Sequence, residues 1–166
     1  PPDAPQQAID GQRWQLGMVE ILPATHTPEL GSPLATFDYI ELVDVRTDRT
    51  EATAGDSVQM TATWQPRPST YRDTYRTRVT LRTSDGAAAQ SWAFTLGGDE
   101  YPSGDWPEQR PVRDVYDLPL AAMLAPGDYT LSIALQRASD GAPIAARQGW
   151  RMIDEVTAAK VRVAPE

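Results

Sequence analysis

The feature that most constrains the fold of this chain is an alternation of apolar and polar residues with a period of two. Successive side chains of a strand point to opposite faces of a sheet, so such a pattern predicts a strand with one buried and one solvated face. Residues 129–135 and 78–82 carry it. It is clearest over residues 57–64, where the apolar positions are Val58, Met60, Ala62 and Trp64.

Turn signals and further apolar runs extend this pattern along the chain. Gly-containing turn sequences surround residues 55, 86, 97, 127 and 141, and only residues 118–124 have the spacing of a short helical turn. In residues 39–45 consecutive apolar residues interrupt the alternation and predict a β-bulge or burial on both faces. The other predicted strands are residues 14–21, 91–95, 112–118 and 159–163. We therefore predict an all-β fold: an antiparallel β-sandwich of about eight strands, Ig-like or jelly-roll in connectivity.

The length and the first residues suggest how the chain is organised. A chain of 166 residues fits one domain. The proline-rich start predicts a linker or N-terminal extension over residues 1–12, followed by a single β-sandwich domain over residues 13–166. This start is typical of a piece cut or processed from a longer protein.

Composition excludes several classes of function. There is no cysteine, which rules out thiol catalysis and thiolate metal sites, and His26 is the only histidine. The net charge of −8 argues against nucleic-acid or anionic-membrane binding, which depends on surplus Lys and Arg. No apolar run reaches the roughly 20 residues of a membrane helix, so we expect no membrane insertion. The 15 prolines and the absence of Asn fit a thermophilic source, whereas the richness in Arg and Ala fits a GC-rich genome equally well.

Several short strand and turn motifs follow one another in a characteristic order. They lie at residues 40–45, 54–65, 79–81 with 84–86, 101–103 with Trp106, 117–120, 125–131 and 160–163. In this order they resemble a family of extracytoplasmic β-sandwich domains, which are appended to bacterial multi-span membrane glycosyltransferases of the dolichyl-phosphate-mannose-dependent type and to related surface proteins. The resemblance implies a non-catalytic accessory domain outside the cytoplasm that faces glycans, although this chain shows no membrane segments of its own.

The long segment 97–113 carries the candidate binding residues. Tyr101 and Trp106 offer aromatic faces for a sugar ring, and the neighbouring charged side chains offer hydrogen bonds to its hydroxyls. The alternative is that both aromatic residues fold down and cap an open end of the sandwich. The acidic group also suits Ca²⁺, although no EF-hand spacing is present. The charged candidates are Asp99, Glu100, Asp105, Arg110 and Arg113.

The other aromatic residues favour structural roles. Trp64, Trp92 and Phe94 are expected in the core because of their positions on alternating strands. Tyr71 and Tyr75 stand among Arg67, Arg72, Arg76 and Arg78, which indicates either an aromatic–basic patch for an anionic ligand or the solvated face of a strand. Trp14 and Trp150 remain undecided between packing and exposure.

Two classes of function follow from the sequence. One is an extracytoplasmic accessory domain that contacts glycans, and the other is a structural or protein-interaction module without a small-molecule ligand. We expect no enzyme activity and no cofactor, because no nucleophile elbow or phosphate loop is present and 23 acidic residues make chance carboxylate pairs unavoidable. A glycan or a cell-surface protein is the expected partner.

Overall fold

The structure, a computed structural model, describes residues 8–9, 13–14 and 31–165. β1 (Ala8–Ile9) pairs antiparallel with β2 (Arg13–Trp14). Apart from Trp14, the strand expected over residues 14–21 lies outside the described residues, as does His26. None of the helices in the described part has the length and apolarity needed to cross a membrane.

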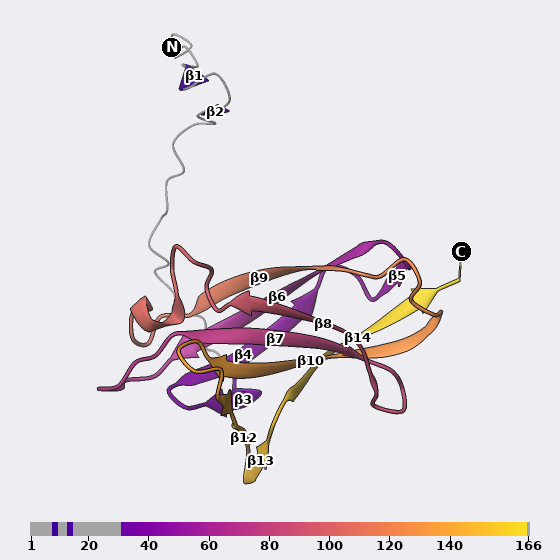
Figure 1. The fold of residues 1–166 in the computed structure, drawn as a ribbon. Coiled ribbons are helices and arrows are strands. Elements are labelled where there is room, and N and C mark those ends of the chain that lie inside the picture. Colours follow the sequence, from indigo (N-terminus) through magenta and orange to yellow (C-terminus); the bar gives the residue numbers. More distant parts are fainter. Residues whose placement is uncertain (1–7, 10–12, 15–30, 166) are drawn as a thin grey trace.

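Two six-stranded sheets form the fold, which confirms the predicted all-β sandwich (Figure 1). All neighbouring strands run antiparallel except β5 and β14. The sheet we call the β7 sheet has the order β5 (Glu51–Thr53), β14 (Val156–Ala164), β10 (Gly127–Arg137), β7 (Tyr75–Arg82) and β8 (Ala88–Thr95), with β11 (Pro143–Ile144) also paired to β10. The β6 sheet has the order β13 (Arg151–Ile153), β12 (Ala146–Gln148), β3 (Ala35–Phe37), β4 (Ile40–Thr47), β6 (Ser57–Pro66) and β9 (Val112–Pro119).

The alternation places the core between the two sheets. The apolar residues of β6 and β10 that the pattern assigned to the inner face are all buried. The predicted bulge is present, because the pairing of β4 with β6 shifts register between Leu42 and Asp44. Phe94 of β8 and Tyr116 of β9 join the two layers, with 5.0 Å between their ring centroids. Within the β6 sheet, the ring centroids of Phe37 and Trp64 are 5.9 Å apart. Trp64 is fully buried, whereas Trp92 and Phe94 are only partly buried against the core.

Two details of the sequence prediction are wrong. The predicted helical turn over residues 118–124 is absent, because Leu118 and Pro119 belong to β9 and the following residues form a turn closed by Leu124 N–H and Ala121 O, 3.0 Å apart. The two sheets contain twelve strands rather than about eight. The additional strands are two or three residues long, too short to show an alternation that a sequence pattern can detect.

Candidate functional site

Four connections meet at one end of the sandwich, which we call the loop end. They are the turn at residues 38–39 and the segments 67–74, 97–111 and 138–142. Hydrogen bonds join them: Tyr39 Oη donates to Asp73 O at 2.6 Å, and Ala138 N–H donates to Thr74 O at 2.8 Å. Arg72 connects segments 67–74 and 97–111 through Glu108, with 2.6 Å between Nη2 and Oε1. Side chains far apart in the sequence therefore lie together here.

Segment 97–111 buries its tryptophan. Trp106 is only 1% exposed, and its Nε1 donates to Tyr101 O at 2.9 Å. Gly97, at φ +84°, lies directly against the indole, since a Cβ there would be 2.7 Å from Trp106 Nε1. The sugar-stacking role expected for Trp106 is therefore wrong for this conformation, and the alternative, a cap over the end of the sandwich, describes it. Tyr101 stays 44% exposed.

The charged candidates of this segment do not converge on one point. Asp99 Oδ1 accepts a hydrogen bond from Thr95 Oγ1 at 2.9 Å and lines a shallow hollow of about 360 Å³ between β8 and β9. The remaining candidates are exposed, and within the described residues their side chains make no hydrogen bond or ion pair; they are Glu100, Asp105, Arg110 and Arg113. The described residues also include no group of three or more Asp, Glu or His side chains arranged to hold a metal ion.

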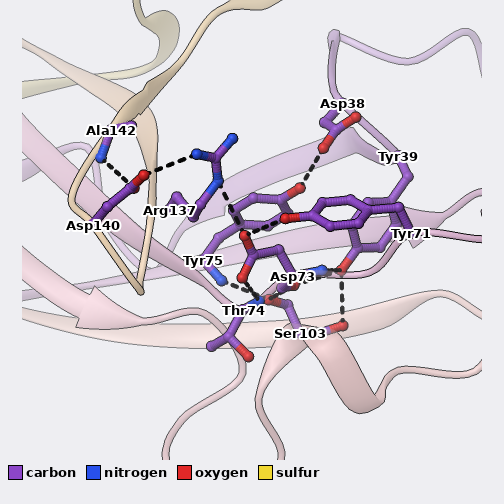
Figure 2. Close-up of polar contacts among 10 residues, drawn as sticks. All are labelled: Asp38, Tyr39, Tyr71, Asp73, Thr74, Tyr75, Ser103, Arg137, Asp140 and Ala142. Atoms are coloured by element: carbon purple, nitrogen blue, oxygen red, sulfur yellow. Dashed lines mark hydrogen bonds and ion pairs between the residues drawn. The ribbon is translucent and has the colours of Figure 1, made fainter.

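Segment 67–74 instead exposes an aromatic ring beside charged groups (Figure 2). Tyr71 is 58% exposed, and its hydroxyl donates to Asp73 Oδ2 at 3.1 Å. This hydrogen bond raises the pKa of Tyr71, because it favours the neutral phenol. Ser69 Oγ donates to Tyr71 O at 2.6 Å and holds the segment in a local turn. The ring therefore presents a face to solvent while its hydroxyl is held in place.

The carboxylate that holds Tyr71 is itself held by an arginine. Arg137 Nε lies 3.1 Å from Asp73 Oδ2, and Arg137 Nη1 lies 3.0 Å from Asp140 Oδ2. The hydrogen bond to Asp140 raises the pKa of Arg137. Ala142 N–H donates to Asp140 Oδ1 at 2.9 Å, and this bond lowers the pKa of Asp140. The four side chains form one connected chain that ends at the exposed ring.

Buried tyrosines stabilise the backbone beneath these four connected side chains. Tyr39 Oη donates to Asp73 O, and burial raises the pKa of Tyr39. Tyr75 Oη donates to Asp38 Oδ2 at 2.6 Å, and burial, followed by this hydrogen bond, raises the pKa of Tyr75. Ser103 Oγ accepts from Tyr75 N–H at 3.0 Å. Asp73 N–H also donates to Tyr39 Oη at 3.2 Å, so the backbone of Asp73 is held at both its N–H and its carbonyl, which orients its side chain at the surface.

The sequence indicated only part of this site. It singled out Tyr71 and Tyr75 as one aromatic–basic patch, whereas Tyr75 is fully buried and Tyr71 is exposed. It missed Asp73, Arg137 and Asp140. The Ser-Asp-Gly turn at residues 139–141 was recognised as a turn, but nothing in the sequence indicates that Arg137 pairs with a residue 64 positions earlier in the chain.

Comparisons with known proteins give a fold and no family. No family model and no curated protein matches the chain. The C-terminal domain of Wzt is similar in structure, with a TM-score of 0.54 and 14% identity over 82% of this chain and 80% of that domain. The CARDB domain of the PF1109 protein from Pyrococcus furiosus, in complex with di-metal ions, gives a TM-score of 0.45 and 11% identity over 84% of this chain and 100% of that one. The first likeness shows that the chain shares the sandwich fold of the Wzt C-terminal domain.

Proposed function

We propose that this chain is a non-catalytic, extracytoplasmic accessory domain that binds a neutral glycan at the loop end, with Tyr71 as the stacking residue. One observation carries the proposal. Tyr71 is the exposed aromatic residue whose hydroxyl is fixed by a carboxylate, and that carboxylate, Asp73, is fixed in turn by Arg137. The family resemblance of residues 37–163 supports the compartment and the attachment to a membrane glycosyltransferase or a related surface protein.

The chemistry of the four side chains suits a sugar ring. The apolar C–H face of a pyranose packs on an aromatic face, and its hydroxyls need acceptors and donors at the rim of that face. Asp73 and Asp140 supply carboxylate oxygens, and Arg137 supplies guanidinium N–H groups. Because these polar groups already hold one another in place, a sugar meets an ordered surface and little conformational entropy is lost on binding.

The local charge favours a neutral ligand over an anionic one. The side chains around Tyr71 include three carboxylates, those of Asp38, Asp73 and Asp140, against two guanidinium groups, those of Arg137 and the adjacent Arg72. Both arginines are engaged in ion pairs. A uronate or a sugar phosphate would therefore meet surplus negative charge, whereas hydroxyl groups would find acceptors.

A glycan array tests the proposal with wild type, Tyr71→Ala and Tyr71→Phe. We expect wild type to bind neutral saccharides and Tyr71→Ala to bind about two- to twelvefold more weakly, which corresponds to the roughly 0.5–1.5 kcal/mol of an aromatic contact. Tyr71→Phe keeps the ring and loses the hydrogen bond to Asp73, so its affinity should lie between the other two.

Two exposed aromatic residues serve as matched controls. Tyr101 lies in segment 97–111 of the loop end, and Trp150, 85% exposed, lies at the tip of the β12–β13 hairpin. Tyr101→Ala and Trp150→Ala should bind as wild type does. Silence of a folded wild-type protein on the array, or full binding by Tyr71→Ala, would overturn the proposal.

A further inference from the structure

The hairpin of β12 and β13, residues 146–153, gathers exposed apolar side chains in one place. Within the described residues, seven large hydrophobic side chains are exposed, and three of them belong to this hairpin or to the segment beside it. They are Trp150 at 85%, Met152 at 65% and Leu34 at 38% exposure. Leu34 lies next to the hairpin, because Gln148 Nε2 donates to its carbonyl oxygen at 3.2 Å. Exposed apolar side chains that gather in this way mark an interaction surface, whereas single ones need no explanation.

The backbone and a neighbouring side chain hold Trp150 at the tip of the hairpin. Gln148 pairs with Arg151, so Gly149 and Trp150 form a two-residue turn. Gly149 has φ +59°, and a positive φ at the first of these positions is what a type II′ turn requires. Arg151 Cζ lies 4.9 Å from the centroid of the Trp150 ring, in a cation–π contact. In Figure 1 the hairpin stands out from the sandwich at the bottom of the view, so the ring is presented outward.

The charge of this hairpin differs from that of the chain as a whole. Residues 146–153 contain Arg147 and Arg151 and no acidic residue. Neither arginine makes an ion pair within the part of the chain that the structure describes. The adjoining residues 31–37 are uncharged. Because the whole chain has a net charge of −8, the residues outside the hairpin carry −10. The hairpin is therefore a positive, apolar tip on an acidic protein.

We propose that this hairpin docks on the surface of an anionic phospholipid bilayer. An indole combines an apolar body with an N–H donor and favours the boundary between lipid headgroups and acyl chains. The guanidinium groups of Arg147 and Arg151 match lipid phosphates, with which arginine forms paired hydrogen bonds. Met152 and Leu34 add apolar surface beside the ring. The contact stays at the headgroup level and needs no membrane-crossing helix, in keeping with the described part of the chain.

The net charge opposes adsorption of the molecule in most orientations, but not through this hairpin. Electrostatic interactions with a charged surface decay over about 8 Å at physiological ionic strength. A bilayer that touches the tip therefore acts most strongly on Arg147 and Arg151 and weakly on carboxylates farther away. Charge thus selects the orientation in which the hairpin faces the lipid and the acidic remainder faces the solvent.

Co-sedimentation with vesicles tests the proposal. The vesicles contain phosphatidylcholine and phosphatidylglycerol in equal parts, and circular dichroism verifies that each variant is folded. We expect wild type to sediment with them and Trp150→Ala to bind at least about tenfold more weakly, because the exposed ring supplies most of the apolar contact. Arg147→Gln with Arg151→Gln should weaken binding by about fivefold for each arginine removed. No binding by wild type, or undiminished binding by Trp150→Ala, overturns the proposal.

A charge-matched variant separates the hairpin from the net charge. Arg110→Gln with Arg113→Gln removes two positive charges at exposed positions in segment 97–111 and β9, and so makes the same change in net charge. This control should bind within about twofold of wild type, since its arginines lie away from the hairpin. Equal losses for the two double variants would show that net charge alone governs adsorption and would overturn the proposal.

Brominated lipids show which tryptophan meets the bilayer. Bromine atoms on the acyl chains quench the emission of an indole that reaches them, so wild-type emission should fall on vesicle binding. Trp150→Phe keeps an apolar ring at the tip but should lose most of this quenching, because the other four tryptophans lie elsewhere in the chain. Equal quenching in Trp150→Phe would show that another surface meets the lipid and would overturn the proposal. Tyr71→Ala should bind vesicles as wild type does, so lipid docking and glycan binding can fail separately.

Discussion

Segments 67–74 and 97–111 both carry an aromatic residue among charged residues, yet they treat it in opposite ways. Trp106 turns inward and donates to a carbonyl of its own segment, Tyr101 O. Tyr71 remains exposed, and its hydroxyl is held by Asp73. The difference follows from what each ring can satisfy in the interior: the Trp106 N–H finds an acceptor 2.9 Å away, and Gly97 leaves room for the ring. One segment therefore stabilises the fold, and the other displays a surface.

The largest test of this contrast is removal of the two rings. Trp106→Ala should lower the free energy of unfolding by about 3–5 kcal/mol, because it removes a fully buried indole from a packed site. Tyr71→Ala should change it by no more than about 0.5 kcal/mol, as is usual for exposed positions. Urea denaturation measures both. Equal losses for the two variants would contradict the distinction between a structural and a displayed ring.

Gly97 allows a sharper test, because Gly98 is its matched control. Both have positive φ, +84° and +77°, but a Cβ at Gly97 would collide with Tyr101 O and Trp106, whereas a Cβ at Gly98 meets nothing within 4 Å. Gly98→Ala should therefore cost only the backbone strain, about 1 kcal/mol, and Gly97→Ala about 2–3 kcal/mol. The free energy of unfolding of each variant gives the comparison, and identical values would show that Gly97 is needed only for its backbone angle.

Serine residues in the two segments extend the same comparison. Ser103 is buried and accepts from Tyr75 N–H, so Ser103→Ala leaves a buried amide without its acceptor and should cost about 1–3 kcal/mol. Ser69 is the counterpart in segment 67–74, where its hydroxyl bonds to Tyr71 O at an exposed site. Ser69→Ala should cost less than about 0.5 kcal/mol. Thermal unfolding resolves this difference, and a larger loss at Ser69 would reverse the assignment.

The smallest expected effect concerns alkaline pH. The pKa of Tyr75 is raised in the folded state by burial, so the fold favours neutral phenol. Its contribution to stability is therefore complete below the ordinary tyrosine pKa of about 10 and decreases as the pH rises above it. The melting temperature should fall above about pH 10, and Tyr75→Phe should make this fall shallower. Tyr71→Phe, which removes an exposed phenol, should change this fall in melting temperature less than Tyr75→Phe does. A larger change for Tyr71→Phe would contradict the argument that burial raises the pKa of Tyr75.

The sequence predicted the long strands well because they are determined by a local pattern, the alternation of apolar and polar residues. The alternation placed the apolar residues of β6 and β10 on the inner face, and the structure confirms this. The predicted solvated face of β10 is wrong at Ser132 and Ala134, which are buried as well. The bulge in β4 was visible for the same reason. The short strands could not be predicted in this way, since pairing to a neighbouring strand defines them more than their own residues do. The helical turn was predicted wrongly because Leu118 and Pro119 pair within the sheet as part of β9.

The site was less predictable because it depends on contacts between distant segments. The sequence left open whether Tyr101 and Trp106 form a binding surface or fold down to cap the sandwich. Trp106 turns inward because the folded segment provides an acceptor and a space for its ring. It grouped Tyr71 with Tyr75, although neighbouring strands and loops bury one and leave the other exposed.

By itself, then, the sequence determined an all-β sandwich, the inner faces of its long strands and a chemistry without thiols. Periodicity and composition are sufficient for these because they act over a few residues or over the whole chain. Only the tertiary structure decided which aromatic ring is displayed and which arginine holds Asp73. Those properties arise from pairings between residues tens of positions apart, whose free energy depends on the geometry of the assembled sheets.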